Sequence, residues 1–240
     1  MNTIRFEDKG NIKMIAHRGV SGLERENTCP AFVAAGVKSY YGIETDVHVT
    51  KDGKIIVIHD DNLKRVAGLD MVVEESTFDE LRQVRMLDTD NKTPRLDLFL
   101  PSLEEYIAIC RKYDKQAILE LKNAMPEDKV WEIAEIIKGL GWFERTTFIS
   151  FAGGNLLSLR KKYPKANAQF LTEKNDEETY RFMVDNKLDA DLCGLCVTKE
   201  FVDKLHAAGL VVNCWTLDSL EHAQLAKAYG VDMITTNILE

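Results

Sequence analysis

From residue 116 onward, the sequence alternates short apolar runs with longer amphipathic stretches. The apolar runs have the length of strands, whereas the stretches between them repeat their apolar residues with the period of a helix. Several helical stretches end at a Gly or just before a Pro, as helix stop signals predict. The alternation is typical of βα units that form a parallel sheet. The six apolar runs are AILEL, TTFISF, ANAQFL, DLCGL, LVVNCWTL and DMITT.

Two further apolar runs, KMIAH and YGIETDVHV, come earlier in the chain and are separated by the helical stretch CPAFVAAGVKSY. They bring the number of expected strands to eight, which is the number that closes a barrel. The alternative is an open sheet of six to eight strands. A dinucleotide-binding sheet is disfavoured because no G-x-G-x-x-G follows the first run. A length of 240 residues suits a single barrel domain spanning 1–240.

The segment TDVHVTKDGKIIVIHD departs from this rhythm because it joins two strand-like runs by a short turn. Parallel strands cannot be joined by so short a link, so we expect residues 54–59 to pair antiparallel with the second barrel strand. An Asp-Gly pair is a strong hairpin signal. If Asp52 and Gly53 are a two-residue loop, Asp46 lies directly opposite His59 with both side chains on one face.

Residues 60–100 follow this hairpin and are polar, without a steady period. They precede the helical stretch PSLEEYIAICRKY. Insertions of this kind usually shape the substrate mouth of a barrel. The predicted fold is therefore a TIM (β/α)8 barrel with a β-hairpin and a small insertion after the second strand.

Composition limits the functions that such a chain can have. A net charge of −8 opposes nucleic acid as a partner, since nucleic-acid binders neutralise phosphates with clusters of Lys and Arg. No apolar run approaches the roughly 20 residues that a membrane-spanning helix requires. The first residues, MNTIRFEDKGN, have no secretory signal pattern, which predicts a soluble protein of the cytoplasm. The sequence carries no signal for an oligomeric state.

The five cysteines are an odd number and are widely scattered, which indicates reduced and mostly buried thiols. Cys193 and Cys196 have the spacing of a redox or zinc motif. However, the chain has no second such pair and no His at a matching interval. We therefore interpret this pair as part of the packing of a short strand.

Carboxylates recur at the ends of the second and third expected barrel strands. Strand alternation directs Glu44 and Asp46 to one face, and likewise Glu120 and Lys122. The C-terminal ends of barrel strands carry the active site in essentially every enzyme of this architecture. Three converging acids repel one another unless a cation joins them, so a divalent ion is expected between Glu44, Asp46 and Glu120. Oxygen ligands favour Mg²⁺ or Ca²⁺ over Mn²⁺ or Zn²⁺.

Basic side chains are expected around the same acids. His17 and Arg18 directly follow the first strand, and the hairpin brings His59 beside Asp46. Two imidazoles can divide the proton transfers of a hydrolysis, one as base and one as acid. Arg18 and Lys122 would hold phosphate oxygens. The histidines interpreted as non-catalytic are His48, His206 and His222.

Several short motifs, in order and at the right spacing, resemble the glycerophosphodiester phosphodiesterase family. The resemblance covers nearly the whole chain and implies a TIM barrel related to that of phosphatidylinositol-specific phospholipase C. The motifs are HRG at 17–19, ENT at 26–28, ETD at 44–46, VTKDG at 49–53, HD at 59–60, ELK at 120–122, SF at 150–151, WT at 215–216 and GVDMITTN at 230–237.

The resemblance also implies roles for individual residues. Glu44, Asp46 and Glu120 look like metal ligands, His17 and His59 like the acid/base pair, and Arg18 and Lys122 like phosphate contacts. Asn27 looks like a polar substrate-site residue near the metal. Trp215 looks like part of the wall against the glycerol side of the substrate. Two departures from the family pattern, Arg25 before ENT and Cys29-Pro30 after it, replace no chemical group.

The expected reaction is hydrolysis of a small-molecule glycerophosphodiester to glycerol 3-phosphate and an alcohol. The attacking group is either water or the neighbouring glycerol hydroxyl, which would form a cyclic phosphate. A second hypothesis is a lysophospholipase D-like enzyme on the same barrel, which would need an apolar acyl path through the insertion. A third is a non-catalytic phosphate-binding barrel. It is disfavoured because every expected acid, base and ligand position holds a chemically competent side chain.

Overall fold

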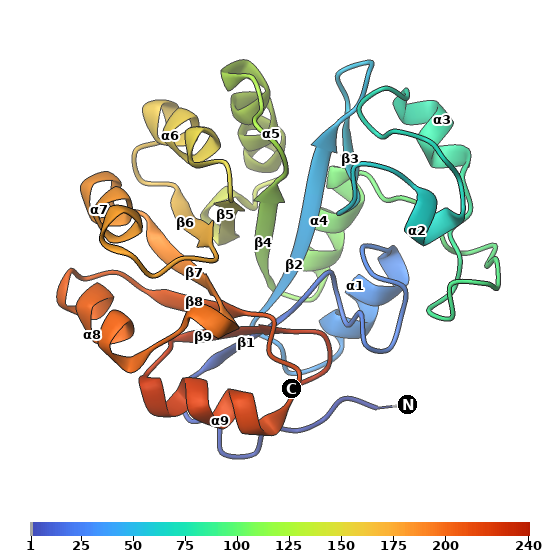
Figure 1. Ribbon diagram of the computed structural model, residues 1–240. Coiled ribbons are helices and arrows are strands. Elements are labelled where there is room, and N and C mark those ends of the chain that lie inside the picture. The colour runs from blue at the N-terminus through green and yellow to red at the C-terminus, as the bar shows by residue number, and fades with distance from the viewer. Residues whose placement is uncertain (1) are drawn as a thin grey trace.

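In the computed structural model, which describes residues 2–240, parallel strands close into a barrel inside a ring of helices (Figure 1). Strand β1 pairs in parallel with both β2 and β9, and this double pairing closes the sheet. The predicted TIM barrel is confirmed, and the open sheet is excluded. The barrel strands of the described residues are β1 (Lys13–Ala16), β2 (Gly42–Val49), β4 (Gln116–Leu121), β5 (Thr146–Ser150), β6 (Asn167–Thr172), β7 (Asp189–Cys193), β8 (Val212–Trp215) and β9 (Met233–Thr236).

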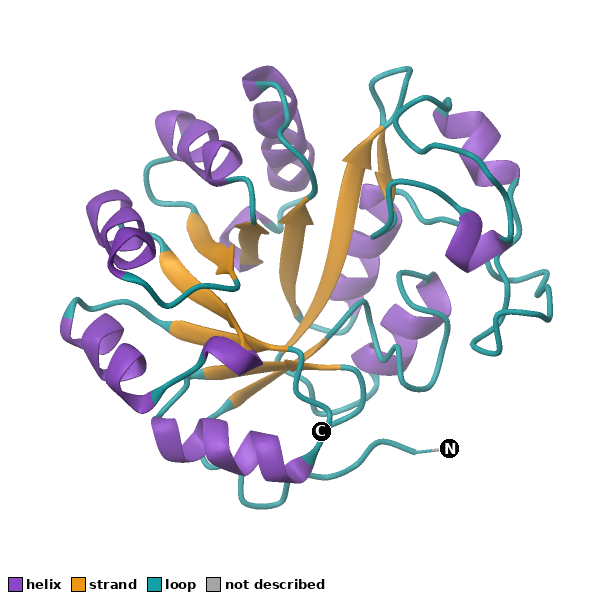
Figure 2. Ribbon diagram, in the orientation of Figure 1, coloured by secondary structure: helices purple, strands orange, loops and turns teal. Residues whose placement is uncertain are grey.

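The helices outside the barrel follow the amphipathic stretches of the sequence (Figure 2). Thr28 caps the first helix by accepting a hydrogen bond from the N–H of Ala31, and Pro30 fits in the first turn. Ser102 and Glu105 form a capping box at the start of α4. The helices are α1 (Cys29–Gly36), α4 (Leu103–Lys112), α5 (Glu127–Gly139), α6 (Gly153–Lys162), α7 (Glu177–Asn186), α8 (Lys199–Ala207) and α9 (Leu220–Tyr229), with 3-10 turns at Phe143–Arg145 and Gly194–Cys196.

The two ends of the described chain lie together between α1 and α9 (Figure 1). Ile4 pairs with Leu239, and the N–H of Phe6 donates to the backbone oxygen of Glu240. Phe6 and Leu239 are buried in the main core. Among residues 2–240, no helix has the length and apolar character needed to cross a membrane.

The hairpin after β2 forms as predicted, but its register differs by one residue. Strand β3 (Ile55–Val57) runs antiparallel to β2, with Val47 opposite Val57. The N–H of Ile58 donates to the backbone oxygen of Asp46, so the prediction that His59 lies directly opposite Asp46 is wrong. The reason is the turn, which contains residues 51–53 rather than an Asp-Gly pair alone, with Gly53 at a positive φ of 76°. Three-residue loops of this kind place a single left-handed residue, usually Gly, at their end.

The insertion at 60–100 has more structure than its polar sequence indicates. It contains helices α2 (Lys64–Ala67) and α3 (Phe78–Gln83). Its apolar side chains pack with those of the β3 region into a small core of their own, which consists of Ile56, Ile58, Leu63, Val66, Val73, Leu81, Met86, Leu98 and Leu100. The insertion therefore behaves as a packed extension of the barrel.

The main core lies between the strands and the surrounding helices, and a smaller apolar cluster fills the barrel interior. Ile15, Ile118, Ile149 and Leu171 form this inner cluster. The cysteines are less buried than predicted, because Cys110 and Cys214 are buried but the other three are only partly so. Cys193 is the last residue of β7 and Cys196 ends the 3-10 turn that follows it, so this pair lies at the edge of a short strand and is only partly buried.

Replacement of two helical glycines tests the packing of α1 against α4. At Gly36 a β-carbon would overlap the ring of Tyr113, whereas at Gly139 it would meet no atom of residues 2–240 within 4 Å beyond its chain neighbours and its own helix backbone. We expect Gly36→Ala to lower the free energy of unfolding by about 1–3 kcal/mol through overpacking. The control Gly139→Ala should leave it unchanged or raise it by up to about 1 kcal/mol. Urea unfolding measures both, and equal stabilities would contradict the packing described.

Candidate active site

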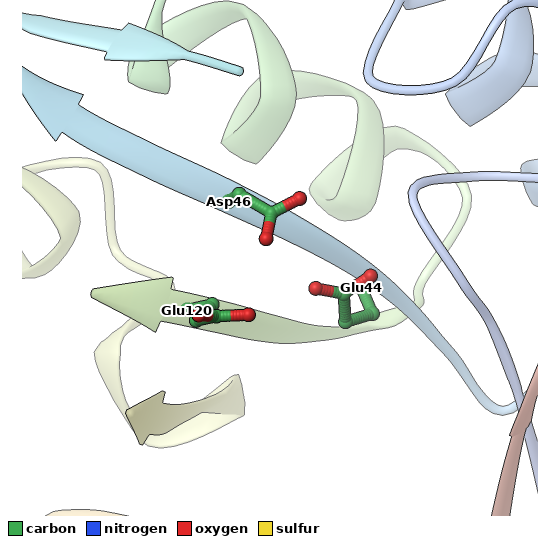
Figure 3. A group of neighbouring side chains, drawn as sticks. All are labelled: Glu44, Asp46 and Glu120. Carbon is green, nitrogen blue, oxygen red and sulfur yellow. The ribbon is translucent and has the colours of Figure 1, made fainter. Parts of the chain in front are cut away.

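Three buried carboxylates from two adjacent strands point toward one another (Figure 3). Glu44 and Asp46 come from β2, and Glu120 comes from β4, where the parallel register places it beside Asp46. Their exposed fractions are 3%, 0% and 7%, and one oxygen from each lies within 4.8 Å of the others. This arrangement could hold a metal ion.

Two cations contact these acids. The backbone N–H of Arg18 donates to Glu44 Oε2 at 2.7 Å, and its Nε lies 3.6 Å from Asp46 Oδ2. Lys122 Nζ lies 2.8 Å from Glu120 Oε1 and 3.8 Å from Asp46 Oδ1. Within this group, three potential negative charges face two positive ones, so the acids are incompletely neutralised.

The pKa values of the acids reflect this imbalance. Burial, followed by the charge of Asp46, raises the pKa of Glu44 well above its usual value. The same two causes raise the pKa of Glu120 to about 8. Burial opposes ionisation of Asp46 as well, but Arg18, His59 and Lys122 hold its pKa well below the usual range. Asp46 is therefore the most readily ionised acid of the group, whereas burial and like charge favour the protonated forms of Glu44 and Glu120.

His17 is fixed by polar contacts with residues that follow β9 and β8. Its Nδ1 lies 2.7 Å from Asn237 Oδ1, and Asn237 Nδ2 donates to Asp218 at 2.6 Å. Because the amide nitrogen of Asn237 is used by Asp218, its oxygen accepts from the Nδ1–H of His17. Nε2 of His17 is left on the side of Glu44, 4.0 Å from Oε2. Burial, followed by the charge of Arg18, lowers the pKa of His17 to about 4.

His59 is linked to Arg18 through three charged side chains. Its Nδ1 lies 2.8 Å from Asp60 Oδ1, and Asp60 accepts two hydrogen bonds from Arg65 at 2.8 and 2.9 Å. Arg65 also donates to both oxygens of Glu26, which accepts from Arg18 Nη1 at 2.8 Å. Arg65 from the insertion therefore links the loop that carries His59 to the loop that carries Arg18.

Asn27 lies beneath the acids rather than in the cavity wall. Its Nδ2 donates to Asp46 Oδ2 at 2.7 Å, and its Oδ1 accepts from Thr45 Oγ1. In this position it orients Asp46. Within residues 2–240, two buried atoms beside it have no hydrogen-bond partner, namely Arg18 Nε and Asp46 Oδ1. Such orphaned atoms point to a ligand that satisfies them.

A small cavity of about 50 Å³ at the barrel mouth is lined by both histidines, Arg18, Glu44 and Glu120. Its wall combines site residues of β1, β2 and β4 with a mainly apolar far side, where Trp215 and Phe151 pack edge to face at 5.6 Å. His48 is buried behind His59, and His206 and His222 are exposed on helices. The residues lining the cavity are His17, Arg18, Glu44, His59, Glu120, Ile149, Phe151, Leu171, Asp191, Trp215 and Thr235.

Comparison with known proteins shows the relationship of this chain. Residues 17–240 match the model of the Glycerophosphoryl diester phosphodiesterase family. The chain belongs to this family. It is 31% identical over 234 residues to a glycerophosphodiester phosphodiesterase of Bacillus altitudinis, with 94% of each chain covered. As a glycerophosphodiester phosphodiesterase, it is a phosphoric diester hydrolase.

Solved structures of this fold come from distant relatives. A phosphodiesterase of Oleispira antarctica, in complex with the product sn-glycerol-3-phosphate, superposes with a TM-score of 0.83 at 22% identity over 94% of this chain and 92% of that one. A glycerophosphodiester phosphodiesterase of Thermotoga maritima superposes with a TM-score of 0.74 at 26% identity, with 94% of each chain covered.

Sequence reasoning brought the acids, both histidines and both cations to one site, but it missed residues that orient them. Glu26 and Asp60 lie next to predicted site residues in the ENT and HD motifs, so their position was a usable signal. Arg65 lies in an insertion without periodicity, and Asn237 reaches His17 only through closure of the barrel. Asp191 also lines the cavity, and no motif drew attention to it.

The ionised state of Glu26 gives a pH-dependent contribution to stability. Burial opposes its charge, but Arg65 and Arg18 lower its pKa from 4.5 to about 2. A shift of this size corresponds to about 3 kcal/mol of stability at neutral pH. The contribution is present above pH 4.5 and is lost as pH falls toward 2, because the unfolded chain binds the proton first. We expect Glu26→Gln to be about 2–3 kcal/mol less stable at pH 7, with the difference shrinking below pH 4.5.

Urea unfolding of both proteins at pH 7 and pH 3 measures this difference. The control is Glu177→Gln, which removes a partner of exposed Lys204 and should change stability by less than about 1 kcal/mol. A Glu26→Gln effect that is the same at both pH values would contradict the assignment.

Proposed function

We propose that this single catalytic domain hydrolyses small glycerophosphodiesters, with a divalent metal ion, to glycerol 3-phosphate and an alcohol. The observation that carries the proposal is the convergence of Glu44, Asp46 and Glu120 within 4.8 Å of one another, on a cavity that two histidines share. Family membership supports the reaction type. The Oleispira relative, which binds sn-glycerol-3-phosphate, supports the product.

The donor set fits a hard divalent ion. All three side chains offer oxygen, which favours Mg²⁺ or Ca²⁺, with Mn²⁺ or Zn²⁺ less suited. Asp46 Oδ1 is buried and without a hydrogen-bond partner among residues 2–240, as a vacant ligand atom would be. With all three acids ionised, a bound divalent ion together with Arg18 and Lys122 would give the group an excess positive charge, which attracts a phosphodiester anion. The chemistry that such an ion supplies when bound is Lewis-acid polarisation of a phosphoryl oxygen.

Arg18 and Lys122 bind the phosphate in this proposal. The Nε atom of Arg18 is buried at the site and has no hydrogen-bond partner within residues 2–240, so a phosphate oxygen can accept from it. Its guanidinium is held in place by Glu26 and by the carboxylate of Asp46. Lys122 offers a positive charge on the Glu120 side. Both cations offset the negative charge that grows on the phosphoryl oxygens in the transition state.

His17 and His59 carry the proton transfers. The Nδ1 atom of each ring contacts an acceptor, Asn237 for His17 and Asp60 for His59, which leaves both Nε2 atoms for the substrate. One imidazole removes a proton from the attacking hydroxyl, and the other donates a proton to the oxygen of the leaving alcohol. The same pair serves either attack by water or attack by the adjacent glycerol hydroxyl followed by hydrolysis of a cyclic phosphate.

The packing of the insertion supports a small diester over a lysophospholipid. An acyl path through the insertion would need its apolar side chains at the mouth. Several of them, such as Val66 and Leu98, are buried in the insertion's own core, and the exposed Leu69, Val72 and Leu96 do not line the cavity. The cavity lining within residues 2–240 includes none of positions 60–100. Trp215 lies on the far wall, where we place the glycerol side of the substrate.

The isosteric variant Glu44→Gln tests the metal-dependent reaction. It removes a negative ligand, but the amide oxygen can still accept from the N–H of Arg18, so the fold should be retained. We expect release of glycerol 3-phosphate from glycerophosphocholine to fall by about 100-fold or more. The control Glu75→Gln, at an exposed acid of the insertion, should retain wild-type activity.

The assay is run with Mg²⁺, with Ca²⁺ and with chelator, and circular dichroism confirms that both variants are folded. Undiminished turnover by Glu44→Gln, or by wild type in chelator, would count against the proposal. A parallel reaction with lysophosphatidylcholine tests the substrate class. Faster turnover of that lipid than of glycerophosphocholine would favour the lysophospholipase D-like alternative.

A further inference from the structure

One acid in the cavity wall has no part in the reaction described above. Asp191 lies on β7, is only 1% exposed and lines the cavity opposite the metal-binding acids. Its Oδ1 has no hydrogen-bond partner in the part of the chain that the structure describes. A buried polar atom without a partner is unfavourable for folding, so its retention in a site wall points to a ligand.

The residues around Asp191 fix its position but leave its Oδ1 without a hydrogen-bond partner within residues 2–240. Trp215 Nε1 donates to the backbone oxygen of Asp191 at 3.2 Å, which fixes this part of β7 against the indole. Asn213 lies beside the carboxyl, where its amide donates to Thr235 Oγ1 at 3.0 Å and its side chain also interacts with Asp191. Burial raises the pKa of Asp191 to about 8, although the interaction with Asn213 acts to lower it. The carboxyl is therefore mostly neutral at pH 7 and can both donate and accept a hydrogen bond.

The position of Asp191 separates it from the phosphate end of the site. The sheet order places β7 across the barrel from β2, which carries Glu44 and Asp46. Between them the far wall is apolar, with Ile149, Leu171 and Trp215. A ligand whose phosphate lies at Arg18 would extend its remaining atoms along this wall. The chemistry offered there is apolar contact with carbon and one hydrogen bond for a neutral hydroxyl.

We propose that the carboxyl of Asp191 determines specificity by binding a hydroxyl group of the glycerol part of the substrate. This inference rests on the proposed function and deepens it. A diester that lacks this hydroxyl would leave the buried carboxyl unpaired, and sites built to bind a hydroxyl discriminate strongly against analogues that lack it. Asp191 is thus assigned to substrate recognition, and His17 and His59 keep the proton transfers.

The test compares Asp191→Ala with wild type on two substrates in the presence of Mg²⁺. Glycerophosphocholine has glycerol hydroxyls, whereas methyl p-nitrophenyl phosphate has none. We expect the ratio of kcat/KM for the first substrate to that for the second to fall by at least about tenfold in the variant. Asp191→Asn, which still donates and accepts, should keep the ratio within about threefold of wild type. An unchanged ratio in Asp191→Ala would overturn the inference.

The matched control is Gln169→Leu on the neighbouring strand β6. Within residues 2–240, Gln169 is also buried with an oxygen that has no hydrogen-bond partner, but it does not line the cavity, so its replacement should leave the ratio unchanged. Because Asp191→Ala removes an unsatisfied buried acid, its melting temperature should equal or exceed that of wild type. If the alanine variant is not obtained folded, Asp191→Leu, which keeps the branched shape of the side chain without its polar atoms, is used in the same comparison.

Binding provides a readout that does not depend on turnover. In calorimetric titrations with Mg²⁺ present, Asp191→Ala should bind glycerol 3-phosphate at least about tenfold more weakly and inorganic phosphate as tightly as wild type. If the variant bound glycerol 3-phosphate and inorganic phosphate equally more weakly than wild type, the inference would be overturned and the proposed function would remain intact. A wild-type protein that does not hydrolyse glycerophosphocholine would refute the proposed function itself, and the inference with it.

Discussion

Mutual repulsion among three buried carboxylates is the constraint around which the active site is organised. Glu44, Asp46 and Glu120 are placed within 4.8 Å of one another and almost out of contact with solvent. Burial and like charge raise the pKa of Glu44 and Glu120, which favours their protonated forms unless a cation binds between them. Arg18 and Lys122 contact the group without neutralising it fully. A divalent ion bound here would release these protons and satisfy the site.

The barrel can accommodate this unfavourable cluster because two hydrogen-bonded strands hold the three acids in place. Parallel pairing of β2 with β4 sets Asp46 beside Glu120, and the helices behind these strands supply the buried apolar area. The loops that follow the strands carry the basic groups. The positions of these basic groups depend on one another. Glu26 contacts Arg18, and Asp60 contacts His59. Arg65 from the insertion hydrogen-bonds to both of these acids.

Most of the fold and the chemical groups of the site could be predicted from the sequence, because they follow from local periodicity. Alternation along a strand directs Glu44 and Asp46 to one face, and the repeating βα rhythm gives the number of barrel strands. The pairing register of β2 with β3 could not be predicted from the sequence pattern, because it depends on the length of the turn and on the positive φ of Gly53 within it. Contacts made by closing the barrel, such as that of Asn237 with His17, have no local signal at all.

The most direct test of the metal site is a crystal structure of the wild-type protein soaked in Mn²⁺, with data collected for anomalous scattering. Manganese shares the octahedral, oxygen-rich preference of magnesium and gives a signal that water does not. We predict a single strong anomalous peak about 2.0–2.3 Å from an oxygen of each of Glu44, Asp46 and Glu120. An anomalous map without a peak between these three carboxylates, at saturating Mn²⁺ and neutral pH, would contradict the assignment of the metal site.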